Sequence, residues 1–154
     1  TPCGTLFPYT TLFRSICAER HMLCPVCQDE MLVLEHNMVE IDWCPECRGA
    51  WLDSGELELV SGAAGQVCAE LEEALMGADG ARPAGGHRPC PVCSRAMLEV
   101  ETHTQPAVVV DRCPKQHGIW FDHGELKSVI EVGGGSETNP LANFFAELAG
   151  DQQD

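Results

Sequence analysis

The chain has 154 residues and a formal net charge of −15, with 24 acidic and only 9 basic side chains. This balance argues against proteins whose affinity depends on many contacts to nucleic-acid phosphates, because those contacts need clustered Lys and Arg. No apolar run approaches the roughly 18 residues that a membrane-spanning helix needs, so we expect no membrane segment. The 10 cysteines are many for this length and require an explanation of their own.

The first residues of the chain do not resemble natural protein sequence. Residues 5–15 read TLFPYTTLFRS, which is the translation of a common short-read sequencing adapter. We therefore expect residues 1–21 to be adapter-derived or otherwise non-native, with a native start near Met22. A charged segment followed by an apolar one, which would indicate secretion, is not visible, and we expect a cytoplasmic protein.

Two cysteine motifs occur twice in the chain, as expected for a tandem repeat. The string CPVC occupies residues 24–27 and again residues 90–93. The string CPECRGAWLDSGEL at 44–57 aligns without a gap with CPKQHGIWFDHGEL at 113–126. Each unit therefore begins with one cysteine pair and reaches a second ligand-like motif after a short interval.

The repeat divides the chain into segments. Residues 22–76 form a first unit and residues 90–132 a second. The residues between them, 77–89, are rich in Gly, Ala and Pro, which is typical of a linker. Residues 133–154 contain a further linker and a short amphipathic helix, which could pack on its own chain or on a partner.

Between the two cysteine motifs of each unit, apolar residues alternate with others that include several acidic ones. The apolar positions are Leu32, Leu34, Val39 and Ile41 in the first unit and Leu98, Val100, Val108 and Val110 in the second. A period of two is typical of half-buried strands. The sequence therefore predicts a β-hairpin in each unit.

A helix is expected after each second motif. Asp53 precedes Glu56, and Asp122 precedes Glu125, by three residues, which is the spacing of a capping box. These carboxylates are therefore interpreted as helix caps rather than acid–base catalysts. The tryptophans that occur two residues before each Asp could grip a partner, but we expect them to pack each helix start against its own ribbon.

The cysteine spacing is typical of a structural metal site. Two thiolates separated by two residues can point at one ion from a tight turn, here called a knuckle, and a Pro at the second position favours the bend. Two knuckles held together by a hairpin supply four ligands in tetrahedral geometry, as zinc prefers. We expect two zinc ions per chain, which would contribute much of the folding free energy of such small units. The expected ligands are Cys24, Cys27, Cys44 and Cys47 for the first ion and Cys90, Cys93, Cys113 and His117 for the second.

The second unit replaces one cysteine. Gln116 aligns with Cys47, but an amide is a poor zinc ligand, whereas the neighbouring His117 is a good one. We expect one extra residue to be accommodated in the turn, so that the second site has three cysteines and one histidine.

Other chemistries of paired cysteines fit less well. Disulfides are typical of secreted proteins, and nothing here indicates secretion. Thioredoxin-type redox chemistry uses one cysteine pair beside a strand–helix–strand pattern, which is not present. An iron site can use four cysteines, but the histidine of the second unit makes it less suitable there.

The succession of CPxC, a hairpin and CPxCxGxWLDxGEL resembles the TFIIB-type zinc-ribbon (transcription factor zinc-finger) family, which also has a CPxxHGxWxDxGEL variant. Residues 24–60 and 90–130 carry the resemblance, with Gln28 where a knuckle often has Gly. It implies metal binding and a zinc-ribbon fold, and the family name implies a link to transcription. The expected fold is a small metal-stabilised α+β protein with two tandem zinc ribbons, each a β-hairpin with two knuckles followed by a short capped helix.

Four protein ligands close each expected site, and no nucleophile–base pair is visible, so we expect no enzymatic activity. The leading hypothesis is a zinc-binding interaction module, a protein-binding adaptor whose protein partner is unknown. One alternative is a nucleic-acid-binding transcription accessory protein, which the family name favours and the charge opposes. Another is a thiol/zinc redox sensor, which would need reactive, exposed thiolates.

Overall fold

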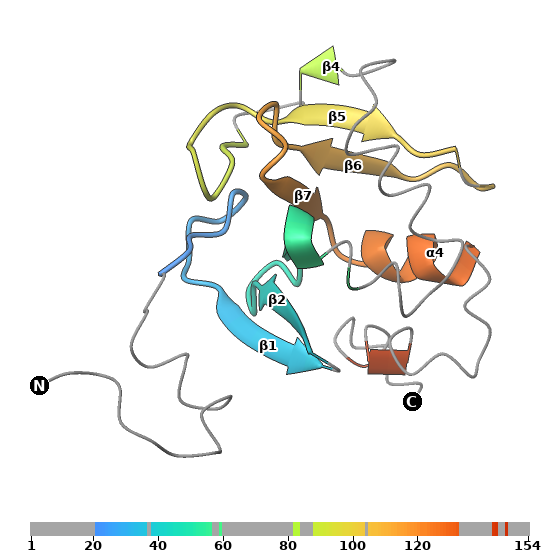
Figure 1. The fold of residues 1–154 in the computed structure, drawn as a ribbon, viewed down its shortest axis with the longest axis horizontal. Coiled ribbons are helices and arrows are strands. Elements are labelled where there is room, and N and C mark those ends of the chain that lie inside the picture. The colour runs from blue at the N-terminus through green and yellow to red at the C-terminus, as the bar shows by residue number, and fades with distance from the viewer. Residues whose placement is uncertain are drawn as a thin grey trace, which may run out of the picture.

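The computed structural model describes residues 21–36, 38–56, 59, 82–83, 88–103, 105–132, 143–144 and 147. Within these residues the chain forms one antiparallel sheet of seven strands in the order β1-β2-β3-β7-β6-β5-β4. Figure 1 shows the β1–β2 hairpin and the β5–β6 hairpin at opposite ends of the sheet, with β7 between them. The residues before His21 and most of the helix expected after the first unit lie outside the described part.

Both predicted hairpins are present. In the first unit β1 (Leu32–His36) pairs with β2 (Val39–Trp43), and in the second β5 (Leu98–Glu101) pairs with β6 (Val109–Arg112). The apolar positions that point to the core are buried, as the period of two indicated. They include Val39, Ile41, Val100 and Val110. Leu32 is an exception, because it lies in β1 at the edge of the sheet and stays exposed.

Two further strands were not predicted. Strand β3 (Ala50–Asp53) and strand β7 (Gly118–Phe121) follow the second motif of each unit, and they pair with one another in the middle of the sheet. Ala50, Trp51 and Leu52 are all buried, as is every residue of β7. A run of four residues buried on both faces has no alternation, so its strand character cannot be recognised from periodicity.

The two zinc-binding units on either side of the expected linker meet in one sheet, because β3 pairs with β7. Within the segment 77–89, the residues of β4 (Arg82–Pro83) pair with β5 of the second unit. The guanidinium of Arg88 donates hydrogen bonds to Asp111 Oδ2 at 2.6 Å and to Asp122 Oδ2 at 2.8 Å.

The helical part of the prediction is only partly met, because strands dominate the described residues. One helix, α4 (Glu125–Val132), forms the end of the second unit and buries Leu126 and Val129. In the first unit, residues 54–56 make a helical turn directly after β3. No helix in the described ranges is both long and apolar enough to cross a membrane.

The predicted capping by aspartate side chains is not observed. Asp53 Oδ1 accepts a hydrogen bond from Trp51 Nε1 at 3.0 Å, and Asp122 Oδ1 accepts one from Trp120 Nε1 at 3.1 Å. The indole N–H is buried and needs an acceptor, so it competes with the N–H groups of the helix N-terminus for the carboxylate. Only Glu125 behaves as in a capping box, since its Oε2 accepts from the Asp122 N–H at 2.7 Å.

The C-terminal segment contacts the first unit through Phe144. The ring of Phe144 stacks on that of His36, with 4.5 Å between ring centroids and 8° between ring planes. His36 is the last residue of β1, so this contact lies at the hairpin end of the first unit.

Candidate metal centres

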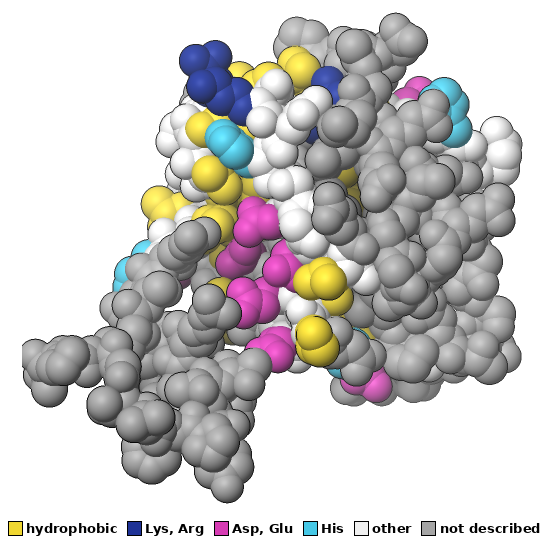
Figure 2. Space-filling view, viewed as in Figure 1, with side chains coloured by type: hydrophobic (Ala, Val, Ile, Leu, Met, Phe, Trp, Pro, Cys, Tyr) yellow, Lys and Arg dark blue, Asp and Glu magenta, His cyan; other side chains and the backbone are white. Residues whose placement is uncertain are grey.

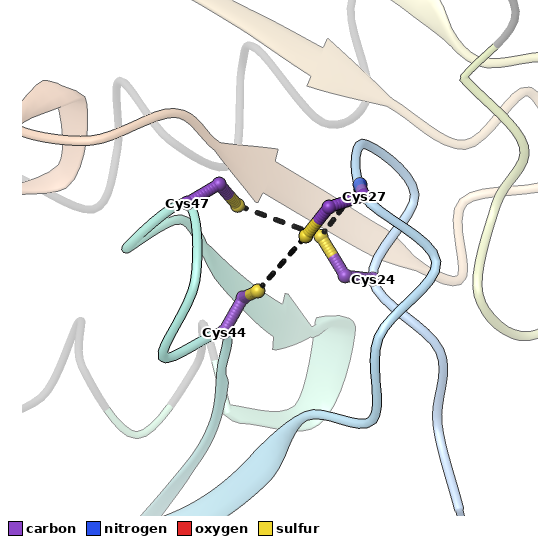
Figure 3. A group of neighbouring side chains, drawn as sticks. All are labelled: Cys24, Cys27, Cys44 and Cys47. Atoms are coloured by element: carbon purple, nitrogen blue, oxygen red, sulfur yellow. Dashed lines mark hydrogen bonds between the residues drawn. The ribbon is translucent and has the colours of Figure 1, made fainter.

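The structure brings the eight predicted ligands together in two groups of four. In each group the ligand atoms all lie within 4.8 Å of one another. Figure 3 shows the first group, where Cys24 and Cys27 approach from one turn and Cys44 and Cys47 from another. The second group consists of Cys90, Cys93, Cys113 and His117. The remaining cysteines of the chain, Cys3, Cys17 and Cys68, lie outside the described residues.

Three of the four knuckles have the same backbone geometry. The residue after the second cysteine, which is Gln28, Arg48 or Ser94, has φ between 59° and 64°. Its N–H donates to the carbonyl of the first cysteine of the pair, four residues earlier, at 2.8–2.9 Å. This left-handed residue reverses the chain, so that both sulfurs of a pair face the same point. None of the three is glycine, although glycine adopts this conformation most easily.

The fourth knuckle is one residue tighter, and this explains how His117 replaces a cysteine. Here the left-handed residue is Gln116, with φ of 60°, and its N–H donates to the Cys113 carbonyl only three residues earlier, at 2.9 Å. The tighter turn leaves Gln116 exposed. His117 Nδ1 then lies 3.4 Å from Cys113 Sγ, among the ligand atoms of the second group.

The distances between ligand atoms suit a tetrahedral zinc ion. Cys24 Sγ lies 3.5 Å from Cys47 Sγ, and Cys27 Sγ lies 3.3 Å from Cys44 Sγ. Zinc–sulfur bonds of about 2.3 Å in a tetrahedron place sulfurs roughly 3.8 Å apart, whereas a disulfide requires about 2.05 Å. None of the seven cysteines in the two ligand groups forms a disulfide. The spacing thus excludes disulfides within the groups and fits one ion in each.

Backbone N–H groups support the buried sulfurs. The N–H groups of Val26 and Val92 point to Cys24 Sγ and Cys90 Sγ at 3.4 Å, and that of Lys115 points to Cys113 Sγ at 3.3 Å. In every knuckle the first cysteine is fully buried. Hydrogen bonds from the backbone stabilise a thiolate at such positions, where water cannot do so.

Burial raises the pKa of four of the ligand thiols above its ordinary value, those of Cys24, Cys27, Cys47 and Cys90. Burial raises the pKa of Cys24 to about 11 and that of Cys90 to about 12. Burial, with the neighbouring Cys44 thiol, raises the pKa of Cys27 to about 12. Cys44 and Cys93 differ, because backbone N–H groups and the nearby ligands outweigh their burial. The pKa of Cys44 is lowered, and that of Cys93 falls to about 7. A divalent ion opposes the effect of burial on the thiol pKa, because it favours the thiolate form. Metal binding therefore releases protons.

Comparison with known families agrees with this geometry. The transcription factor zinc-finger (TFIIB-type zinc-ribbon) family matches residues 23–60 and again residues 89–132, which together make up more than half of the chain. The chain belongs to the TFIIB-type zinc-ribbon family. It carries two tandem zinc ribbons, and each can hold one zinc ion. No curated protein and no solved structure matches the chain.

Two residues of each zinc ribbon that matter to the metal groups were missed or misinterpreted. Gly49 and Gly118 were not singled out, yet the N–H of Cys44 donates to the Gly49 carbonyl at 2.9 Å and that of Cys113 to the Gly118 carbonyl at 3.1 Å. Trp51 and Trp120, two residues after these glycines, also pack on the other unit. The signal that could have revealed both is the Gly-x-Trp string at the same place in each repeat.

Proposed function

We propose that this zinc-ribbon protein is a non-catalytic interaction module that binds a protein partner. Each metal group has four side-chain ligands, and the first residue of each pair is fully buried. Catalytic zinc sites keep one position for water or substrate, whereas structural sites are closed by four protein ligands. This arrangement supports a structural role for the metal.

Exposed apolar side chains on the first unit carry the proposal. Leu23 and Val26 on the first knuckle, and Leu32 and Val33 on β1, are between 43% and 51% exposed. Strand β1 lies at the edge of the sheet, and no other strand among the described residues pairs with its outer side. A sheet edge offers backbone hydrogen-bonding groups to an incoming extended segment, and neighbouring apolar side chains add contact area.

The charge of the molecule favours a protein partner over nucleic acid. The formal net charge is −15, and seven ligand thiolates with two Zn²⁺ ions make it more negative still. Figure 2 shows acidic side chains gathered in the middle of one face, with Lys and Arg at its upper edge. A partner segment with apolar residues flanked by basic ones would match this surface.

The experiment is an affinity capture with immobilised, zinc-loaded protein, compared across matched variants. Val26→Ser combined with Leu32→Ser removes two exposed apolar side chains without touching the core. Met38→Ser is the control, because Met38 is 77% exposed in the turn between β1 and β2. We expect a partner that the original protein and the control retain and the double variant loses. A partner held equally by all three, or no partner, would contradict the proposed surface.

A further inference from the structure

The central pair of strands is nearly symmetric. Trp51 lies opposite Trp120, and these two residues are equivalent in the repeat. On one side of them Ala50 pairs with Phe121, and on the other Leu52 pairs with Ile119, the equivalents in reverse order. The seam between β3 and β7 is therefore an approximately two-fold interface, in which each unit presents the same surface to the other.

Each tryptophan covers a glycine of the opposite unit. A Cβ atom on Gly49 would lie 2.1 Å from Cζ2 of Trp120, and a Cβ atom on Gly118 would lie 2.7 Å from Cζ2 of Trp51. Such diagonal neighbours on adjacent strands are within reach of a large aromatic ring. No side chain other than the hydrogen of glycine fits beneath either ring.

These same glycines close the ligand turns. The Gly49 carbonyl accepts from the N–H of Cys44, and the Gly118 carbonyl accepts from the N–H of Cys113, as described above. Both cysteines are fully buried members of the metal groups. Each indole therefore packs on the residue that holds a ligand turn of the other unit.

Two further contacts link the units at the same place. The N–H of Ser54, in the first unit, donates to the carbonyl of His117, in the second, at 3.0 Å. Both tryptophans also belong to one buried cluster that contains cysteines of both metal groups. Those cysteines are Cys24, Cys44, Cys90 and Cys113.

We infer that Trp120 is a positioning residue for the first metal site and Trp51 for the second, so that the two zinc ions bind and leave as a coupled pair. The inference rests on the zinc binding that the proposed function requires. Groups that hold metal ligands in place typically change metal affinity by about 10–100-fold when removed. Here each tryptophan contributes to the metal affinity of the other ribbon, because it packs on a ligand turn of that ribbon.

The test uses the full chain loaded with Co²⁺, whose visible spectrum differs between a four-cysteine site and a site with three cysteines and one histidine. A chelator titration then gives the affinity of each site. Trp120→Ala should weaken the four-cysteine site by about 10–100-fold, and Trp51→Ala should weaken the histidine-containing site to a similar extent. Trp120→Phe keeps a ring over Gly49 and should recover most of the affinity.

A double-mutant cycle isolates the contact itself. Gly49→Ala alone should weaken the four-cysteine site, because its Cβ displaces the indole of Trp120. Combined with Trp120→Ala it should add little, since the ring that it would meet has gone. Gly55→Ala is the matched control, because a Cβ there has nothing within 4 Å, and it should leave both sites unchanged.

Three results would overturn the inference. Trp120→Ala could weaken only the histidine-containing site, or Trp120→Phe could lower the metal affinity as much as Trp120→Ala does. The third result is independent release of metal from the two sites of the original protein. If Trp120→Ala holds no metal, the order of release in Trp120→Phe decides. If the four-cysteine site loses its metal earlier relative to the other site than it does in the original protein, the inference is supported, and the opposite change contradicts it. Failure of the original protein to bind Co²⁺ or zinc would instead refute the proposed zinc-stabilised module.

Discussion

At the residue scale, His117 has a geometric reason to occupy the fourth ligand position. In a knuckle with two cysteines, the left-handed residue comes directly after the second ligand. In the fourth knuckle it comes directly before His117, at Gln116. The imidazole is longer than a thiol side chain, and the shift of one residue in the turn still brings Nδ1 to 3.4 Å from Cys113 Sγ.

His117→Ala should therefore lose the ion of the second site, since three cysteines remain with no fourth ligand. Because Trp51 and Trp120 link the units, we also expect the first site to hold its ion less tightly than in the original protein. Zinc per chain, measured after dialysis against a weak chelator, checks this. Gln116→Gly is the control and should keep both ions, because the side chain of Gln116 is exposed and glycine readily adopts the left-handed conformation of this position. Retention of two ions by His117→Ala would show that the ligand assignment is wrong.

Glu125 is the described carboxylate whose pKa departs most from its ordinary value. Burial raises its pKa from 4.5 to about 7, and the nearby carboxylates of Asp122 and Asp111 add to the rise. The folded state therefore binds this proton more tightly than the unfolded state. The resulting stabilisation is fully present below about pH 4.5 and is lost as the pH rises through about 7.

Glu125→Gln should for this reason stabilise the protein at pH 8. The amide oxygen can still accept from the Asp122 N–H, while the charge that opposes burial is removed. We expect a gain of roughly 1–2 kcal/mol in the free energy of unfolding at pH 8, allowing for solvent screening of a partly exposed group, and a smaller gain near pH 5.5. Denaturant unfolding of both zinc-loaded proteins at the two pH values measures it. A gain independent of pH would mean that ionisation of Glu125 is not its cause.

At the element scale, β3 and β7 do more than extend two hairpins. They are short and buried on both faces, and they place the Gly-x-Trp segment of one unit beside that of the other. The hydrogen bonds from the two indoles to Asp53 and Asp122 fix the orientation of the rings that contact the glycines. The seam is thus a packed interface with no space for an additional side chain at Gly49 or Gly118.

Gly118→Ala should consequently destabilise the whole sheet. The new Cβ would lie 2.3 Å from the Leu52 carbonyl oxygen, a backbone atom, so the pairing of β3 with β7 must shift. Overpacking of this kind costs about 1–3 kcal/mol or more. Chemical unfolding followed by tryptophan fluorescence gives the value. Gly55→Ala, in open space, should change it by no more than about 0.5 kcal/mol, and equal effects of the two substitutions would contradict the packing argument.

At the scale of the whole molecule, the two metal groups belong to a single sheet rather than to separate domains. The hairpins lie on either side of the seam, as Figure 1 shows, and the apolar edge strand β1 lies at one end of the sheet. Acidic side chains gather on the face that lies over β1 and β2 (Figure 2). The molecule therefore combines a metal-stabilised framework with an exposed apolar edge and a strongly negative charge.

The charge leads to a prediction about nucleic acid. Binding driven by release of counterions from phosphates needs several basic side chains on one surface, and the chain has only 9 Lys and Arg against 24 acidic residues. We expect no appreciable binding of duplex DNA or of RNA by the zinc-loaded protein near physiological salt. A gel-shift assay over a range of salt concentrations checks this. Micromolar or tighter binding, weakening steeply with salt, would favour the transcription accessory role over the adaptor.

Features that depend on local spacing could be predicted from the amino-acid sequence. Cysteines two residues apart can meet one ion only from a tight turn, so the pairs beginning at Cys24, Cys44 and Cys90 were recognisable as ligands. His117 followed from the chemistry of its side chain, although the one-residue change of the turn at Gln116 did not. The alternation of apolar residues identified both hairpins, because only one face of each is buried.

The way in which the two units meet could not be predicted from the sequence, because it depends on contacts between distant residues. The four-residue strands β3 and β7 carry no period, and the pairing of Trp51 with Trp120 joins residues far apart in the chain. Such a contact is selected by the fit of an indole over a glycine, which depends on the shape of both units once folded. Capping by the two aspartate side chains is not confirmed, also because of a tertiary contact. Asp53 and Asp122 have the right spacing for capping, but a buried indole N–H in the folded protein requires their carboxylates.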